Sequence, residues 1–106
     1  MRLFLVAFSP FMFYYINVAQ NKKLNNRLLR KPKDFTWKEL IKVLNGFGYK
    51  QVSVGKTAGS RVRFIRENYP PITLHKPHPK SILKQYQLED IINLLEREKL
   101  IKEAIL

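Results

Sequence analysis

The chain has 106 residues, a length that favours a single domain with a small core. It has no cysteine, which excludes disulfides and thiolate metal sites and fits a reducing cytoplasm, and its two histidines argue against a histidine-rich metal site. Twenty Lys and Arg residues against eight Asp and Glu residues give a net charge of +12, which indicates a polyanionic partner: nucleic acid, an anionic membrane surface or an acidic protein.

The first 33 residues are considered apart from the rest. Residues 3–19 are almost wholly apolar, and a basic run without acids follows them. A transmembrane helix would be short and interrupted by Pro10. A signal peptide would have only Arg2 as its early charge and a poor cleavage site. The third interpretation, which we favour, is upstream sequence with the natural start nearer the basic run. Residues 1–33 are therefore treated as an extension and residues 34–106 as the domain.

A first helix is expected to begin after Thr36. Thr36 and Glu39 have the spacing of a capping box, in which each side chain binds the backbone N–H of the other residue. Apolar residues recur every three or four positions and share one face: Trp37, Leu40, Ile41 and Leu44. This stripe favours core packing for Trp37 over stacking on a base. Gly46 and Gly48 are expected to end the helix.

Three short strands should follow, at residues 50–54, 61–65 and 72–75. The first alternates apolar and polar residues, so we expect it to be half-buried with Val52 and Val54 on one face. A glycine-containing turn at residues 55–60 separates it from the second strand. In the other two strands the apolar residues point inward, and the outward positions hold Arg61, Arg63, Thr73 and His75. An antiparallel meander is the simplest pairing.

A final helix is expected over residues 87–104, with a short helical turn before it at residues 81–85. Its buried stripe consists of Leu88, Ile91, Ile92 and Leu95. Acids in the first turn and cations in the last turns agree with the helix dipole. The sequence thus predicts an α+β fold: a helix, a three-stranded antiparallel sheet and a helix, with both helices on one sheet face and a cationic face open to solvent.

This order of elements and three motifs resemble the HicA family of toxins from type II toxin–antitoxin systems. The motifs are TWKELIKVLNGFGYKQV, GKTAGSRVRF and ITLHKPHPKSILKQYQLEDIINLL, and they lie within residues 36–95. The resemblance implies a fold like that of double-stranded-RNA-binding domains. It also implies cleavage of mRNA without a metal ion or other cofactor, and neutralisation by a HicB-type antitoxin.

One departure from the family concerns catalysis. The family has Gly-Ser-His in the second strand, and its histidine is catalytic, whereas this chain has Gly59, Ser60 and Arg61. Arginine stays protonated in proteins, so Arg61 cannot act as a general base near neutral pH. The later His-Pro pair of the family is kept as His78 and Pro79.

The candidate site therefore combines histidines with cations. Metal-free RNA cleavage needs a base near the 2′-hydroxyl, an acid at the leaving oxygen and positive charge at the phosphate. We expect His78 to act as base or acid with His75 as its partner, and Arg61 to stabilise the phosphate. The residues expected to bind RNA are Lys56, Ser60, Arg61, Arg63, Arg66, Lys76 and Lys80. The alternative for His78 is a structural role in a turn between two prolines.

Three functions remain open. The first is an mRNA-cleaving toxin that is silent while its antitoxin is bound. The second is an RNA-binding module that has lost catalysis together with the family histidine. The third, a membrane-associated basic protein, depends on residues 3–19 alone. In the first two cases phosphate contacts should dominate, so RNA binding should weaken steeply with salt.

Overall fold

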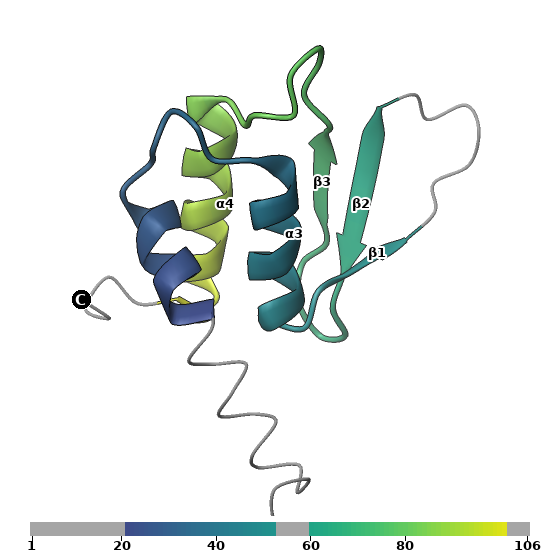
Figure 1. The fold of residues 1–106 in the computed structure, drawn as a ribbon. Helices are drawn as coiled ribbons and strands as arrows, with labels where there is room; N and C mark the ends of the chain where they lie inside the picture. The colour runs from purple at the N-terminus through teal and green to yellow at the C-terminus, as the bar shows by residue number, and fades with distance from the viewer. Residues whose placement is uncertain (1–20, 53–59, 102–106) are drawn as a thin grey trace, which may run out of the picture.

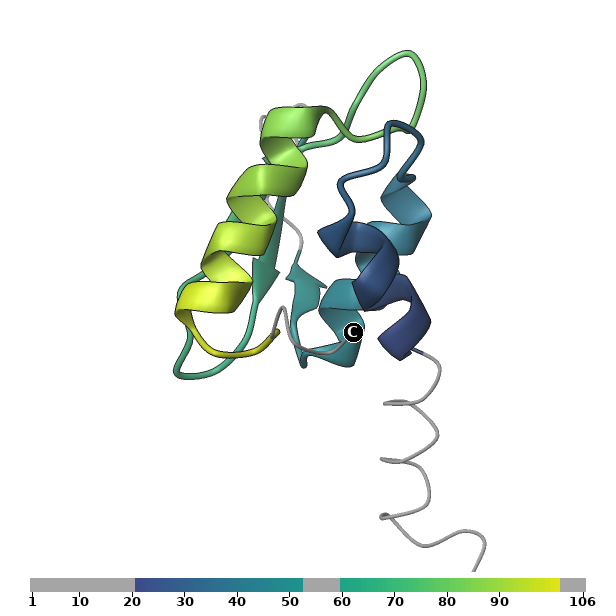
Figure 2. The same ribbon diagram turned by 90° about the vertical axis from the view of Figure 1, so that its left-hand side faces the viewer.

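The computed structural model describes residues 21–52 and 60–101 of the chain. Its elements, in chain order, are a helical segment at residues 21–29, α3 (Trp37–Gly46), β1 (Lys50–Val52), β2 (Arg61–Ile65), β3 (Ile72–His75) and α4 (Gln85–Arg97). α3 and α4 lie on one face of the sheet, and the helix of residues 21–29 packs on their side away from the sheet (Figures 1 and 2). The expected α+β arrangement is confirmed.

The sheet is an antiparallel meander in the order β1–β2–β3. β2 and β3 have the expected bounds, and their alternation turns apolar side chains toward the helices: Phe64, Ile72 and Leu74 are buried. β1 is a strand as expected, but the expectation that it is half-buried was wrong, because all three of its residues are exposed. Val52 lies opposite Arg63 in the ladder, and paired residues share a face, so Val52 lies on the open side. Val54 and the turn residues 55–59 lie outside the described residues.

α3 begins as its sequence predicts. The Thr36 hydroxyl accepts the N–H of Glu39 at 3.1 Å, and the Glu39 carboxylate accepts the N–H of Thr36 at 2.9 Å, which completes the capping box. Trp37 is buried, with its ring centroid 6.0 Å from that of Phe64, which confirms it as a core residue. The helix ends at Gly46, and Gly48 takes a φ of +89°, a conformation that favours glycine.

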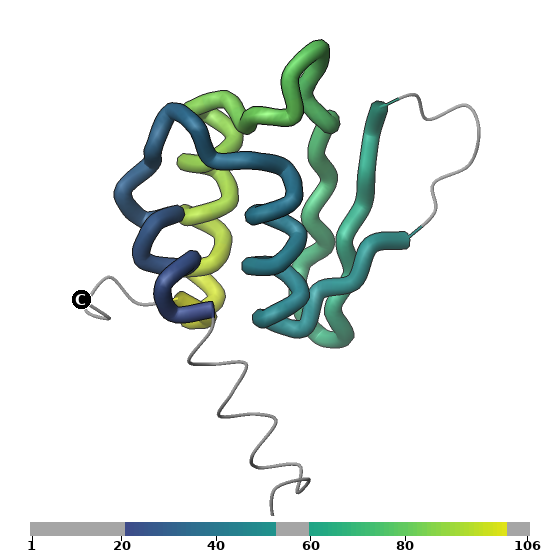
Figure 3. Tube along the Cα trace, viewed as in Figure 1, coloured from purple at the N-terminus to yellow at the C-terminus, as the bar shows by residue number. Residues whose placement is uncertain are grey.

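The chain before α4 is extended rather than helical. Trp37 donates its N–H to the Ser81 carbonyl, and Leu83 donates its N–H to the Phe35 carbonyl, both at 2.9 Å. Residues 81–83 therefore pair with residues 35–37, and Figure 3 shows the two connections meeting at one end of the molecule. The expected helical turn at residues 81–85 was wrong, because this backbone pairs with a neighbouring segment instead of with itself.

α4 begins two residues earlier and ends earlier than expected. Gln87 accepts the N–H of Lys84 at 3.0 Å and so caps the helix from within its first turn. At the other end Lys99 has a φ of +61°, which stops the helix after Arg97. Ile101 then folds back into the core, while residues 102–106, with the predicted end at Ala104, lie outside the described residues.

The helix of residues 21–29 belongs to the same core. Leu28 of this helix is fully buried in the core cluster, although the domain predicted from the sequence began at residue 34. Asn21 lies against Gly46, where an added Cβ would collide with the asparagine side chain. No helix within residues 21–52 and 60–101 is long and apolar enough to cross a membrane, and the apolar residues 3–19 lie outside these ranges.

Candidate nucleic-acid interface

The face of the sheet away from the helices is cationic. Arg61 and Arg63 of β2 are exposed, and the ladder places them opposite His75 and Thr73 of β3, which are exposed as well. Val52 continues this face on β1. The sequence predicted this open cationic face because the buried residues of β2 and β3 alternate with these positions. Both predicted arginines and one predicted histidine therefore share one surface.

Ser60, Arg61 and His75 form a cluster at one end of this face. The Oγ atom of Ser60 lies 3.4 Å from Nδ1 of His75, and the Ser60 carbonyl accepts the N–H of Lys76 at 2.9 Å. Hydrogen-bonded and non-hydrogen-bonded pairs alternate along an antiparallel ladder, so the neighbouring pair of Arg61 and His75 is of the second kind. Side chains approach most closely in such pairs. His75 of β3 thus lies directly across the ladder from Arg61.

Gln87 of α4 supports this cluster from the helix side. The residue is 4% exposed, and its Nε2 atom donates to the His75 carbonyl at 3.0 Å. The sequence reasoning missed this residue because it considered only the apolar members of the buried stripe. A usable signal was present: Gln87 stands one position before Leu88 and four before Ile91, on the buried side of the helix.

The loop between β3 and α4 holds the other predicted loop residues. Lys76, His78 and Lys80 are all exposed, whereas Pro77 is buried. The structure describes no hydrogen bond to the His78 imidazole from residues 21–52 or 60–101. Of the two histidines, His75 is therefore the one whose ring contacts the predicted Ser60 and Arg61 region.

Arg66 is held away from the predicted site. Its Nη1 atom donates to the Phe47 carbonyl at 2.7 Å, and its guanidinium lies 4.1 Å from the ring centroid of Tyr69. These contacts attach the end of β2 to the chain after α3, at the opposite end of β2 from Arg61. The guanidinium of Arg66 thus makes contacts within the protein. Lys56 lies outside the described residues.

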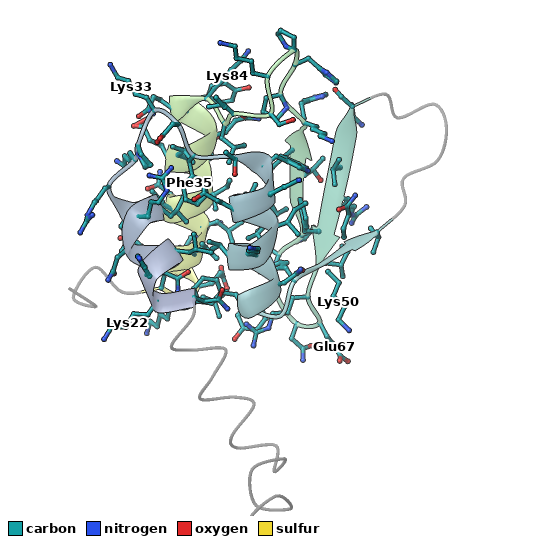
Figure 4. All side chains as sticks on the ribbon, in the orientation of Figure 1. Lys22, Lys33, Phe35, Lys50, Glu67 and Lys84 are labelled. Carbon is teal, nitrogen blue, oxygen red and sulfur yellow. The ribbon has the colours of Figure 1, made fainter. Side chains whose placement is uncertain are left out.

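A second group of cations lies on the segment before α3. It contains no acid between residues 21 and 33, and its exposed cations are Lys22, Lys23, Arg30, Lys31 and Lys33. Figure 4 shows Lys33 at the same end of the molecule as Lys84, and the side chain of Gln85 donates to the Pro32 carbonyl at 3.3 Å. The exposed side of α4 differs, because it carries Glu89 and Asp90.

Comparison with known protein families gives one match. Residues 37–97 match the family described as HicA toxin of bacterial toxin-antitoxin. No curated protein and no solved structure matches the chain. The matched residues begin with the first residue of α3 and end with the last residue of α4, so they include the whole helix–sheet–helix unit and more than half of the chain. The chain therefore belongs to the HicA toxin family of bacterial toxin–antitoxin systems.

Proposed function

We propose that this toxin is a metal-independent endoribonuclease that cleaves mRNA on the open face of its sheet and so inhibits translation. The observation that carries the proposal is the position of His75, which lies opposite Arg61 and against Ser60 on a cationic surface. A polyanion is attracted to such a surface, and an imidazole titrates near neutral pH. Groups suited to binding RNA and a group suited to proton transfer therefore lie on the same face of the sheet.

The proposed reaction divides the work between these residues. The 2′-hydroxyl attacks the adjacent phosphorus, so a P–O2′ bond forms while the P–O5′ bond breaks. His75 takes the proton of the 2′-hydroxyl, and His78 on the neighbouring loop gives a proton to the leaving 5′-oxygen. Arg61 and Arg63 stabilise the charge that grows on the phosphate oxygens. His75 thus takes the part that Arg61 cannot take.

The alternative is an RNA-binding module without catalysis. Arg61 in place of the family histidine favours it, because the substitution removes a proton-transfer group and adds a phosphate-binding one. The cationic face supports RNA binding in both cases. The two proposals therefore differ in whether the RNA is cleaved and not in how tightly it is bound.

The antitoxin is proposed to act on the same face. A HicB-type partner that covers Arg61 and Arg63 with acidic or apolar groups would exclude RNA by occupying the same charges. Lys76 and Lys80 on the adjoining loop extend this surface. The toxin should then be unable to bind antitoxin and RNA at the same time. Arg63→Glu should weaken the binding of both.

A cleavage assay in EDTA tests the enzyme. We expect the full chain to cut a labelled RNA, His75→Gln to abolish cutting and His78→Gln to slow it. Arg97→Gln, on the far end of α4, serves as the control and should cut like the wild type. Normal cutting in His75→Gln would contradict the catalytic role proposed for His75, and loss of cutting in His78→Gln alone would leave His78 as the essential histidine.

The same assay identifies the alternative. Arg61→His restores the histidine of the family pattern at its own position. RNA binding without cleavage by the wild type, combined with cleavage by Arg61→His, would show a binding module that has lost its catalytic group. Neither binding nor cleavage by any variant would contradict both proposals.

A further inference from the structure

The amide of Gln87 is buried and has hydrogen bonds at both ends. Its Oε1 atom accepts the N–H of Lys84 at 3.0 Å, and its Nε2 atom donates to the His75 carbonyl at 3.0 Å. The residue is only 4% exposed. A buried amide left without partners would be costly, so these two bonds fix both its place and its orientation.

Capping alone does not require glutamine at this position. A glutamate in the first turn would accept the same N–H and would also interact favourably with the helix dipole. Glutamate is ionised near neutral pH, however, and cannot donate to a carbonyl. The Nε2 group of Gln87 is therefore needed for the hydrogen bond to His75 and not for capping the helix.

The geometry of the ladder leaves the His75 carbonyl without a donor on β2. Arg61 and His75 form a non-hydrogen-bonded pair, so the carbonyl of His75 points away from β2. β3 is an edge strand of the described sheet, and His75 is its last residue. Gln87 supplies the hydrogen bond that this carbonyl receives from the helix side.

We infer that Gln87 is a positioning residue for His75, an inference that rests on the proposed RNA cleavage. It fixes the backbone of His75 from the helix side, while Ser60, the residue before β2, contacts the imidazole. The phosphate-binding residues Arg61 and Arg63 lie on β2 and have no bond to Gln87 within the described residues. Gln87 therefore acts on the catalytic step and not on the affinity for RNA.

Steady-state cleavage of a labelled RNA by Gln87→Glu and Gln87→Met tests this inference. The first variant keeps the acceptor for Lys84 and loses the donor for His75, and the second loses both without burying a charge. We expect kcat to fall by about 10- to 100-fold in both, because a small misplacement of a reacting group has effects of this size, while KM changes less than about twofold. Circular dichroism confirms that both variants are folded.

Gln85→Glu is the matched control. Gln85 lies in the same turn of α4, is exposed and contacts Pro32 instead of His75, so this variant adds the same charge near the same helix end. We expect it to keep the kcat of the wild type. Normal kcat in both Gln87 variants, or an equal loss in Gln85→Glu, would overturn the inference. A rise in KM alone would do so too, because it would assign Gln87 to RNA binding.

Amide hydrogen exchange provides a readout that does not depend on cleavage. We expect the amides of residues 74–76 to exchange faster in both Gln87 variants than in the wild type and in Gln85→Glu. A wild type that cleaves no RNA would contradict the proposed function, and exchange would then decide the positioning by itself. Faster exchange confined to the Gln87 variants would support it, and unchanged exchange would overturn it.

Discussion

Arg27 and Glu39 join two helices through one carboxylate. The Nε atom of Arg27 lies 2.9 Å from Oε2 of Glu39, and the other oxygen of Glu39 accepts the N–H of Thr36 at 2.9 Å. Arg27 also reaches the carboxylate of Asp34 at 2.9 Å, and its guanidinium lies 5.6 Å from the ring centroid of Phe35. The group that starts α3 thus also holds the helix of residues 21–29.

Arg27→Met should lower the free energy of unfolding. The variant removes the charged hydrogen bonds to Glu39 and Asp34 but keeps an unbranched apolar stem near Phe35. Urea denaturation measures the change. Arg30→Met, at an exposed position of the same segment, controls for the lost charge and should change stability by less than about 0.5 kcal/mol. Equal losses in the two variants would show that the ion pairs contribute nothing.

Glu39 should make stability depend on pH in the acid range. Burial by itself raises its pKa, but the hydrogen bonds from Arg27 and Thr36 outweigh burial, so the pKa lies below the ordinary value of 4.5. A carboxyl with a lowered folded pKa stabilises the fold fully above its unfolded pKa and loses this effect as pH falls through the folded pKa. The free energy of unfolding should therefore decrease below about pH 5.

Glu39→Gln should flatten this part of the pH profile. Urea denaturation at several pH values between neutral and acid conditions gives the slope for each variant. Glu67→Gln, at an exposed acid in the turn after β2, should keep the slope of the wild type. A wild-type slope in Glu39→Gln would assign the acid sensitivity to other carboxyls.

Leu28→Ala should destabilise the fold by about 2–4 kcal/mol, because Leu28 is fully buried and its truncation leaves a cavity. Thermal or urea denaturation measures the loss. Lys23→Ala, on the exposed side of the same helix, should stay near the wild type. A loss below about 0.5 kcal/mol for Leu28→Ala would mean that residues 21–29 do not contribute to the core.

Arg63→Gln should weaken RNA binding and lower the slope of log affinity against log salt by about 1. The arginine is exposed on the open face, so its loss removes one phosphate contact and little stability. Fluorescence anisotropy at several salt concentrations gives both quantities. Arg97→Gln removes the same charge from α4 and should leave the slope unchanged. Equal effects of the two variants would indicate that net charge alone determines binding.

The predictable parts of the fold depend on local signals. The capping box and apolar stripe of α3 lie within a few residues of one another, and the alternation in β2 and β3 is equally local. Val52 was misplaced because alternation predicts which residues share a face but not which face a short edge strand turns to the core. Residues 81–83 were misread because their pairing partner lies about 45 positions earlier in the chain.

The residue types of the candidate site could be predicted from the sequence, but the contacts that these residues make could not. Exposed arginines in alternating positions predicted the cationic face. The occupation of Arg66 by the Phe47 carbonyl and Tyr69 depends on how the end of β2 meets the chain after α3, which no sequence spacing reveals. The bond between Gln87 and His75 likewise joins two elements whose approach is set by tertiary packing.

The pairing of residues 81–83 with residues 35–37 limits the freedom of the loop that carries His78. Lys76 is bonded to Ser60 before the loop, and Ser81 is bonded to Trp37 after it, so only residues 77–80 lie between the two anchors. Two of these four are prolines, whose rings restrict φ. His78 therefore lies in a short segment with few accessible conformations. A ligand that contacts it needs to order little additional chain, so the entropic cost of binding is low.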